Sequence, residues 1–432
     1  MLYPNLSVNA AGHLLFAGYD TVELAARYGT PLLLMDASLI RSRCRAYKTA
    51  MAEVFPAGSG PAYASKAFCC KRIYEIMREE DMGVDVVSGG ELYTALRAGF
   101  PAEKAYFHGN NKTDEDIRFA IEHRVGYFVC DSAEELTAIQ AEAARQGVTQ
   151  KLLLRLTPGI DPHTHEKINP GRVDCKFGAA IETGQAEELT ALALAQPNLR
   201  LCGFHCHIGS QIFDIGPFCD AAEIMLGFIA RIRDRFGYTA EVLDLGGGRG
   251  VPYTDRDPAI DYGENIRAIA RVFSDICDRL GVPAPAVLME PGRSIVGDAG
   301  LTVYTVGSVK TIPGFKNYVS VDGGMSDNPR YTLYQAEYTV LAAGRMGDGP
   351  DGDYTVAGRC CESGDLLQEG VPLPDLERGE LLAVCTTGAY NYAMASNYNR
   401  IPRPPIVNLD ETGADRVTVR RETYEDMTRN EV

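Results

Sequence analysis

The amino-acid sequence predicts an α/β protein built from a (β/α)8 barrel and a mainly β C-terminal domain, a β-sandwich or barrel. Between residues 60 and 290, eight short apolar runs each end in glycine or a polar residue, and each precedes a segment with the periodicity of an amphipathic helix. After residue 295 the pattern changes to strand-like pieces separated by Gly, Pro and Asp turns. At 432 residues, 45% of them hydrophobic, the chain is long enough to bury two cores.

The eight predicted barrel strands recur at intervals that leave room for one helix between each pair. They span residues 60–66, 82–88, 104–109, 126–131, 151–158, 199–208, 240–248 and 285–292. Eight such strands over this length fit a closed barrel better than an open doubly wound sheet. The barrel is therefore predicted over residues 37–295.

The β domain is predicted from both ends of the chain. Its C-terminal strands are expected at residues 302–309, 318–321, 354–357 and 381–387. The apolar run at residues 31–36 exceeds the barrel count, so residues 1–36 are assigned with 296–432 to the β domain. The polar tail from residue 410 is expected to fray.

The charge and cysteine content exclude several classes of protein. A formal net charge of −16 and a pI near 5.0 disfavour nucleic acid and anionic membranes as partners. No run of about 18 apolar residues and no signal-like N-terminus occurs, so a cytoplasmic protein is expected. The twelve cysteines are expected to be thiols, mostly buried and inert, because two pairs are adjacent in sequence and the chain lacks secretion signals.

Polar residues and glycines gather where the predicted barrel strands end, which is the face that carries chemistry in this fold. They are Lys66, Ser88, His108, Arg155, His205, His207, Gly246 to Gly248 and Glu290 to Arg293. This concentration at one rim predicts an active site.

Lys66 follows the apolar run at residues 61–65, which is expected to carry its ammonium group into the barrel mouth. Burial disfavours a charged amine and so favours a Schiff base with a carbonyl cofactor. An isolated lysine at a strand end would normally just reach solvent. The neighbouring motifs favour the cofactor.

Two of those motifs follow the seventh and eighth strands, whose loops frequently form the phosphate site of such barrels. Gly246 to Gly248 offers bare backbone N–H groups to a phosphate. Glu290 to Arg293 adds a further glycine, and the carboxylate of Glu290 could keep a pyridine nitrogen protonated. A phosphorylated ligand is predicted.

His205 and His207 lie on one face of the sixth strand, because side chains alternate along a strand. Such a pair can bind a metal, but a flat imidazole stacked on a cofactor ring is the preferred role for His207. His163 and His165 form a second pair in a loop without an obvious third ligand. No metal is expected.

The ordered motifs resemble the fold-type III pyridoxal-phosphate decarboxylases over nearly the whole chain. The shared segments are residues 63–66, 205–211, 246–248, 290–293 and 361–365. Residues 85–92, 108–112, 321–325 and 390–405 are most similar to the branch of that group that decarboxylates meso-diaminopimelate to L-lysine and carbon dioxide.

The resemblance implies a role for each motif residue and a homodimer with shared active sites. Lys66 would carry pyridoxal 5'-phosphate, His207 would stack on its ring and Glu290 would pair with the ring nitrogen. Cofactor contacts are also implied for Gly247, Gly248, Gly292, Arg293 and Tyr390. Substrate contacts are implied for Arg293, Arg330, Tyr334, Glu362 and Tyr390, and Cys361 would be the acid that protonates the α-carbon.

The charges of these residues favour the same substrate. A distal carboxylate and a distal ammonium need facing cations and an anion, which Arg293, Arg330 and Glu362 would supply. Phe68, Arg249 and residues 169–171 depart from the family pattern, with an aliphatic residue common at the position of Arg249. A decarboxylase of arginine or ornithine, an amino-acid racemase and an inactive homologue acting as a binding partner are the alternatives.

Overall fold

The computed structural model describes residues 3–160 and 175–432 and divides into two compact units. The barrel unit comprises Arg43–Gly250 and Ile260–Gly292. The β unit comprises Met1–Ser42, Val251–Ala259 and Arg293–Val432. Val251–Ala259 thus interrupts the barrel sequence, and the carbonyl of Tyr253 accepts a hydrogen bond from the N–H of Thr339 within the β unit (3.2 Å).

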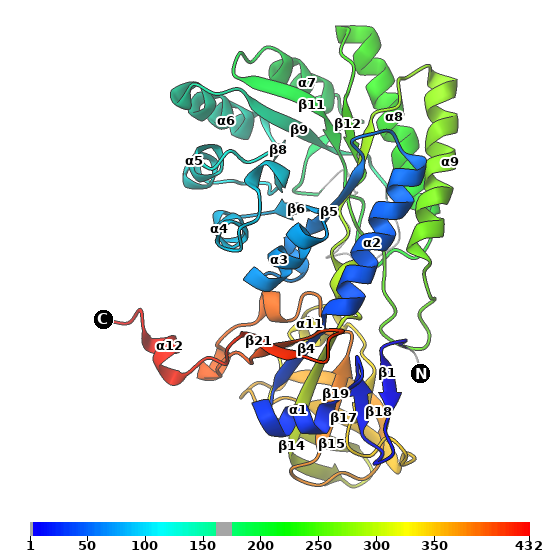
Figure 1. The fold of residues 1–432 in the computed structure, drawn as a ribbon, viewed down its shortest axis with the longest axis vertical. Helices are drawn as coiled ribbons and strands as arrows, with labels where there is room; N and C mark the ends of the chain where they lie inside the picture. The colour runs from blue at the N-terminus through cyan, green and yellow to red at the C-terminus, as the bar shows by residue number, and fades with distance from the viewer. Residues whose placement is uncertain (1–2, 161–174) are drawn as a thin grey trace. The chain divides into compact units, whose positions relative to one another are not determined.

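The barrel unit contains eight parallel strands in a closed ring with helices outside it (Figure 1). The strands are β5 (Gly60–Ala64), β6 (Gly83–Val86), β7 (Ala105–Phe107), β8 (Tyr127–Cys130), β9 (Gln150–Thr157), β11 (Leu199–His205), β12 (Val242–Asp244) and β13 (Ala286–Met289). The ring closes because β13 pairs with β5 and β9 pairs with both β8 and β11. The predicted (β/α)8 barrel is confirmed, and a two-residue strand, β10 (Ala179–Ala180), adds to β9.

A helix connects each strand of the ring to the next, and another precedes the first strand. The helices are α2 (Ala37–Val54), α3 (Lys71–Glu79), α4 (Gly89–Arg97), α5 (Asp114–Glu122), α6 (Ala133–Gln146), α7 (Gln185–Leu194), α8 (Gly216–Phe236) and α9 (Tyr262–Leu280). The side chains of Ser88, Ser132 and Asp261 cap the N-termini of α4, α6 and α9 by accepting backbone N–H groups. The helices therefore begin directly after the strand-end loops that carry the polar residues.

The β unit contains a large mixed sheet and a small antiparallel sheet of β1 (Leu6–Val8), β2 (Leu14–Phe16) and β3 (Tyr19–Asp20). The large sheet is formed by β4 (Leu32–Asp36), β14 (Gly300–Ile312), β15 (Lys316–Val321), β16 (Val340–Ala342), β17 (Gly352–Ala357), β18 (Leu366–Leu373), β19 (Leu381–Cys385), β20 (Ile406–Leu409) and β21 (Asp415–Val419). The predicted mainly β domain is confirmed. The N-terminal strand β4 lies between β14 and β20, so the two ends of the chain share one sheet.

Short helices connect parts of the β unit and shape its loops. They are α1 (Thr21–Tyr28), α10 (Arg293–Val296), α11 (Arg330–Tyr334) and α12 (Tyr424–Thr428). In the tail, β21 pairs with β20, and a capping box between Thr423 and Asp426 starts α12.

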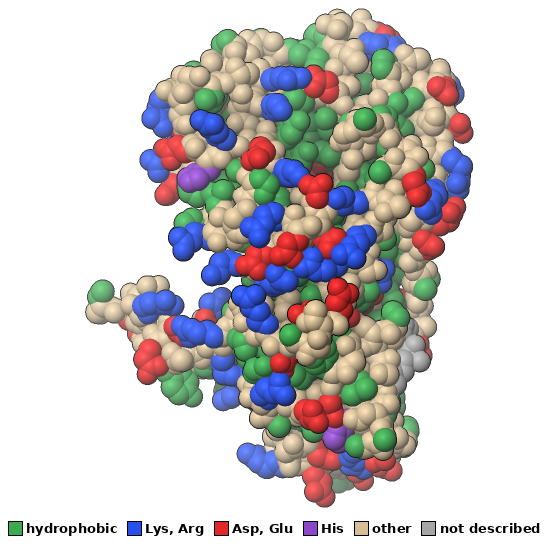
Figure 2. All heavy atoms as spheres, in the orientation of Figure 1, with side chains coloured by type: hydrophobic (Ala, Val, Ile, Leu, Met, Phe, Trp, Pro, Cys, Tyr) green, Lys and Arg blue, Asp and Glu red, His purple; other side chains and the backbone are tan. Residues whose placement is uncertain are grey.

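The structure shows how the charged side chains are distributed on one face and the state of the cysteines. Basic and acidic side chains are interspersed over the face shown in Figure 2. All twelve cysteines are free thiols, and Cys361 is exposed. Among the described residues, no helix is both long and apolar enough to cross a membrane.

Candidate active site

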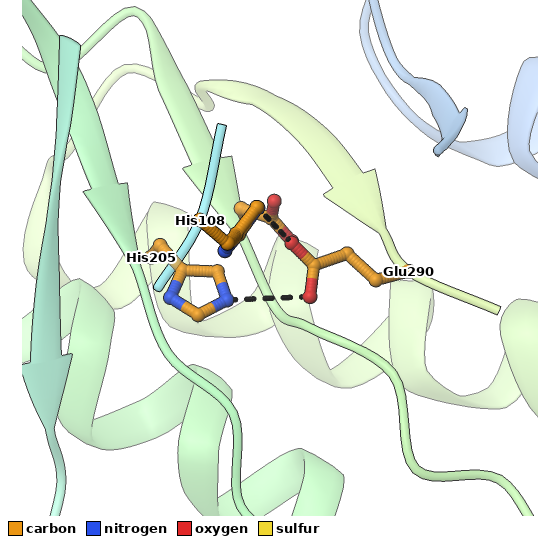
Figure 3. A group of neighbouring side chains, drawn as sticks. His108, His205 and Glu290 are labelled. Atoms are coloured by element: carbon orange, nitrogen blue, oxygen red, sulfur yellow. Dashed lines mark hydrogen bonds and ion pairs between the residues drawn. The ribbon is translucent and has the colours of Figure 1, made fainter. Parts of the chain in front are cut away.

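The barrel site centres on Glu290, a buried carboxylate directly after β13. Its Oε1 lies 2.8 Å from Nε2 of His108, which follows β7. Its Oε2 lies 3.4 Å from Nε2 of His205, the last residue of β11. Figure 3 shows both imidazole rings directed at this carboxylate. Two strands that do not neighbour β13 in the ring, β7 and β11, thus bring imidazoles to the carboxylate that follows β13.

The charge of this cluster is concentrated on Glu290. Burial by itself would raise the pKa of Glu290, but the rings of His108 and His205 hold it well below its usual range. Burial lowers the pKa of His205 to about 4. Burial and the nearby charge of Glu290 raise the pKa of Asp244 well above its usual range. At neutral pH the cluster therefore holds a negative charge on Glu290, which can attract a cation.

The glycines after β12 and β13 allow the strand-end loops to pack backbone against backbone. A Cβ on Gly247 would lie 2.1 Å from the carbonyl oxygen of Glu290, and one on Gly248 would lie 2.3 Å from that of Gly209. A Cβ on Gly292 would lie 2.9 Å from Cβ of Ala64. No larger residue fits at these positions. The loops after β11, β12 and β13 therefore pack closely at these glycines, together with the end of β5. Glycine-rich backbone of this kind can offer its N–H groups to a phosphate.

Lys66 lies in a single 3₁₀ turn, η1 (Ser65–Ala67), directly after β5. The expectation that it is buried is wrong, because β5 ends at Ala64 and this turn leaves the side chain exposed. His207 is half-buried beyond the end of β11. Burial, followed by the positive charges of Lys66 and Arg155, lowers the pKa of His207 well below its usual range. A neutral, flat imidazole therefore lies within the electrostatic reach of the Lys66 ammonium group.

The β unit brings three of the predicted substrate residues, Arg293, Arg330 and Tyr390, together with two further tyrosines. Nη1 of Arg330 donates to the hydroxyl of Tyr338 (2.9 Å), and its guanidinium lies 4.9 Å from the ring centroid of Tyr253. Nη1 of Arg293 donates to the hydroxyl of Tyr253 (2.6 Å), and its guanidinium lies 4.7 Å from the ring centroid of Tyr390. We call these five residues the arginine–tyrosine cluster.

The loops that carry Cys361 and Arg330 are joined by a buried carboxylate. Asp365 accepts the N–H of Met325 through Oδ1 (2.6 Å) and that of Cys360 through Oδ2 (2.7 Å). The N–H of Cys361 donates to Oδ1 of Asn399 (2.6 Å). These bonds fix the backbone N–H groups of Cys360 and Cys361.

The structure does not bring every predicted residue together. Tyr334 is half-buried, and Glu362 is exposed. Among the described residues, Glu362 forms no ion pair with either arginine of the arginine–tyrosine cluster. His163, His165 and residues 169–171 lie outside the described residues.

Several site residues carried no sequence signal for their role. His108 stands at a predicted strand end and Asp244 lies inside the predicted strand 240–248, but the sequence alone does not show that both lie beside Glu290. Tyr253 and Tyr338 were not singled out at all, because a tyrosine in a loop or near a strand resembles an ordinary core residue.

The comparison with family models defines the class to which this fold and site belong. Residues 37–297 match the pyridoxal binding domain of the pyridoxal-dependent decarboxylases. The match covers the barrel strands and the Glu290 cluster, and it ends shortly after Arg293.

Relatives of the whole chain give the particular family. The diaminopimelate decarboxylase of Bacillus subtilis is 47% identical over 98% of this chain and 95% of the relative. That of Staphylococcus aureus is 41% identical over 98% of both chains. The chain belongs to the diaminopimelate decarboxylases, within the pyridoxal-dependent decarboxylase family.

Solved structures agree with this assignment. The diaminopimelate decarboxylase of M. jannaschii in complex with L-lysine has a TM-score of 0.92 and 33% identity, covering 99% of this chain and 98% of that one. A lysine/ornithine decarboxylase from Vibrio vulnificus, complexed with putrescine, has a TM-score of 0.75 and 25% identity over 90% and 97%. The lower similarity to the ornithine-acting protein disfavours that alternative.

Proposed function

We propose that this protein removes the α-carboxyl group of meso-2,6-diaminopimelate to give L-lysine and carbon dioxide, with pyridoxal 5'-phosphate as cofactor. The observation that carries the proposal is the Glu290 cluster, a buried carboxylate kept anionic beside the closely packed glycine loops after β12 and β13. The family membership of the whole chain supports the same reaction. The reaction is the last step of lysine biosynthesis.

The barrel residues fit this cofactor. Lys66 would hold it through Nζ, Gly247, Gly248 and Gly292 would leave room for its phosphate, and His207 would lie flat against its ring. Glu290 would accept a hydrogen bond from the ring nitrogen and keep its proton in place, because an anionic acceptor favours a protonated donor. When bound, the cofactor supplies an electron-poor ring that accepts the electron pair left by the departing carboxylate.

The β-unit residues fit the two ends of the substrate. Arg293 and Arg330 supply cations for carboxylates, and Tyr334 and Tyr390 supply hydroxyl groups. Glu362 supplies an anion for the distal ammonium. Ornithine has no distal carboxylate, so a buried arginine such as Arg330 favours diaminopimelate over ornithine.

Cys361 is assigned as the acid that delivers a proton from Sγ to the α-carbon after carbon dioxide leaves. Its exposed thiol lies on a loop that Asp365 and Asn399 hold through the backbone, so the thiol is available to a ligand. The family resemblance also supports a homodimer whose subunits share the active sites, and the twelve free thiols support a reducing compartment such as the cytoplasm.

The decisive experiment is a substrate panel. The purified protein with pyridoxal phosphate is incubated separately with meso-diaminopimelate, ornithine, arginine and lysine, and carbon dioxide and the amine product are measured. Carbon dioxide and L-lysine are expected from diaminopimelate only. Gas from another amino acid would overturn the roles of Arg330 and Glu362. Inversion of a stereocentre without gas would indicate a racemase, and no reaction would favour a binding partner.

A further inference from the structure

Arg249 places a buried positive charge directly after the glycine loop of the barrel unit. Its side chain is 4% exposed, and burial lowers its pKa from the usual value. A guanidinium remains charged in proteins even when its pKa falls.

The surroundings of Arg249 are aromatic and carry no formal negative charge. Its guanidinium lies 4.7 Å from the ring centroid of Phe218 on α8 and 6.0 Å from that of Tyr47 on α2. Its Nε is buried without a hydrogen-bond partner, and none of the described carboxylates lies at ion-pair distance from it. Aromatic faces attract a cation but do not neutralise it. The positive charge is therefore uncompensated within the described part of the barrel unit.

The backbone holds Arg249 in a fixed relation to the glycine loop. The N–H of Ile212 donates to the carbonyl of Gly248, and the N–H of Gly250 donates to the carbonyl of Ile212, both at 3.0 Å. The hydroxyl of Tyr262, whose ring stacks on Tyr47, donates to the carbonyl of Gly250 (2.8 Å). These bonds fix the backbone of Arg249 beside the glycine loop.

Resting on the cofactor named above, we propose that Arg249 is a specificity residue whose buried charge, on the residue that directly follows Gly246 to Gly248, favours phosphorylated over unphosphorylated pyridoxal. The phosphate dianion supplies the negative charge that the surroundings of Arg249 lack. An aliphatic residue would fill the same space without attracting the phosphate. Since the charge is shielded from water, its field is weakly screened at the loop.

The test compares the affinities of the cofactor-free protein for pyridoxal phosphate and for pyridoxal, measured by absorbance titration. The ratio of the two dissociation constants reports the contribution of the phosphate. In Arg249→Met this preference is expected to fall about tenfold, the size of a moderate charge–charge interaction through protein. In Arg249→Lys, which keeps the charge, it is expected to stay within about twofold of the wild type. Arg235→Met, an exposed arginine that contacts Phe236 on α8, is the matched control and should change nothing.

Each outcome decides the proposal. An unchanged preference in Arg249→Met would overturn it, as would an equal loss of affinity for both ligands, which would indicate a purely structural role. If Arg249→Met does not fold, Arg249→Gln replaces it with the same expectation. A wild-type protein that binds neither ligand would instead refute the proposed cofactor.

Discussion

The Glu290 cluster of the barrel unit and the arginine–tyrosine cluster of the β unit are opposite in charge and in construction. In the first, one buried carboxylate is surrounded by two imidazoles and the carboxyl group of Asp244, whose pKa is raised by burial and by Glu290. In the second, two buried guanidinium groups lie among tyrosine rings and hydroxyls. Each cluster can bind a ligand group of the opposite charge. The difference indicates that the barrel favours a cationic ring and the β unit an anionic substrate.

The largest effect is expected from removing the amine that would hold the cofactor on the barrel side of this comparison. Lys66→Ala should lower carbon dioxide release from diaminopimelate by at least about 1000-fold, because the amine that forms the bond to the cofactor is removed. Borohydride reduction of the wild type should attach the cofactor to Lys66, as read by peptide mass. Lys71→Ala, a nearby exposed lysine, is the control. Normal turnover by Lys66→Ala would refute the assignment.

The second largest effect is expected from neutralising Glu290, the buried carboxylate of the barrel unit. Glu290→Gln is expected to reduce kcat by about 100- to 1000-fold with little change in KM, because the carboxylate acts on the reacting ring and not on substrate binding. Steady-state kinetics with diaminopimelate measure this, and Glu290→Asp should recover part of the rate. A rise in KM alone would indicate that Glu290 binds the substrate, a role expected of the arginine–tyrosine cluster in the β unit.

Cys361, the exposed thiol of the β unit, is expected to donate the proton that completes L-lysine formation. Cys361→Ala should lower L-lysine formation by about 100-fold, a typical contribution of one positioned acid, while cofactor affinity stays near that of the wild type. Amino-acid analysis and cofactor titration on the same sample separate the two. Cys360→Ala, a buried neighbour, is the control for the loop. Wild-type turnover by Cys361→Ala would show that Cys361 is not the acid that protonates the α-carbon.

Loss of a positive charge from the arginine–tyrosine cluster should weaken binding of the substrate. Arg330→Met should raise KM for diaminopimelate about 10- to 100-fold, the value of a buried charge-assisted hydrogen bond, with a smaller effect on kcat. Tyr338→Phe removes one hydroxyl from the same cluster and should raise KM by less than about tenfold. If Arg330→Met lowered kcat and left KM unchanged, the arginine–tyrosine cluster would not be a substrate anion site.

The smallest effect is a difference between the units in their response to acid. Burial lowers the pKa of His205 to about 4. Between pH 6.5 and 4 this imidazole is therefore protonated in the unfolded chain and stays neutral in the folded barrel. This costs stability as pH falls, by roughly 2–3 kcal/mol across the window. Burial raises the pKa of Asp327 in the β unit to about 7, so its contribution to stability is lost as pH rises from 3.8 to 7.

Urea unfolding midpoints measured from pH 4.5 to 6.5 test this contrast. His205→Gln should make the midpoint rise less steeply with pH, and Asp327→Asn should make it rise more steeply. Two variants that shift the slope in the same direction would contradict the opposite signs assigned to these groups.

The sequence predicted the order and approximate positions of the barrel strands well, and their exact ends and mutual contacts poorly. The runs before Lys66, His207 and Glu290 were recognisable because a buried parallel strand is a short apolar run that ends in polar residues or glycine. The pairing of His108 with Glu290 depends on closure of the ring, which brings together residues from the third and eighth barrel strands. The exposure of Lys66 depends on where β5 ends, and the length of an apolar run does not fix that residue.

The position of β4 also affects how the chain folds during synthesis. Leu33 is paired with Thr302 on β14 and with Ile406 on β20, so this strand is made early but finds its last partner only near the end of translation. The barrel strands lie between, and all of them leave the ribosome first. We therefore expect nascent chains that stop before β20 to contain a protease-resistant barrel and an N-terminal segment that proteases still cleave, because contacts so distant in sequence form late.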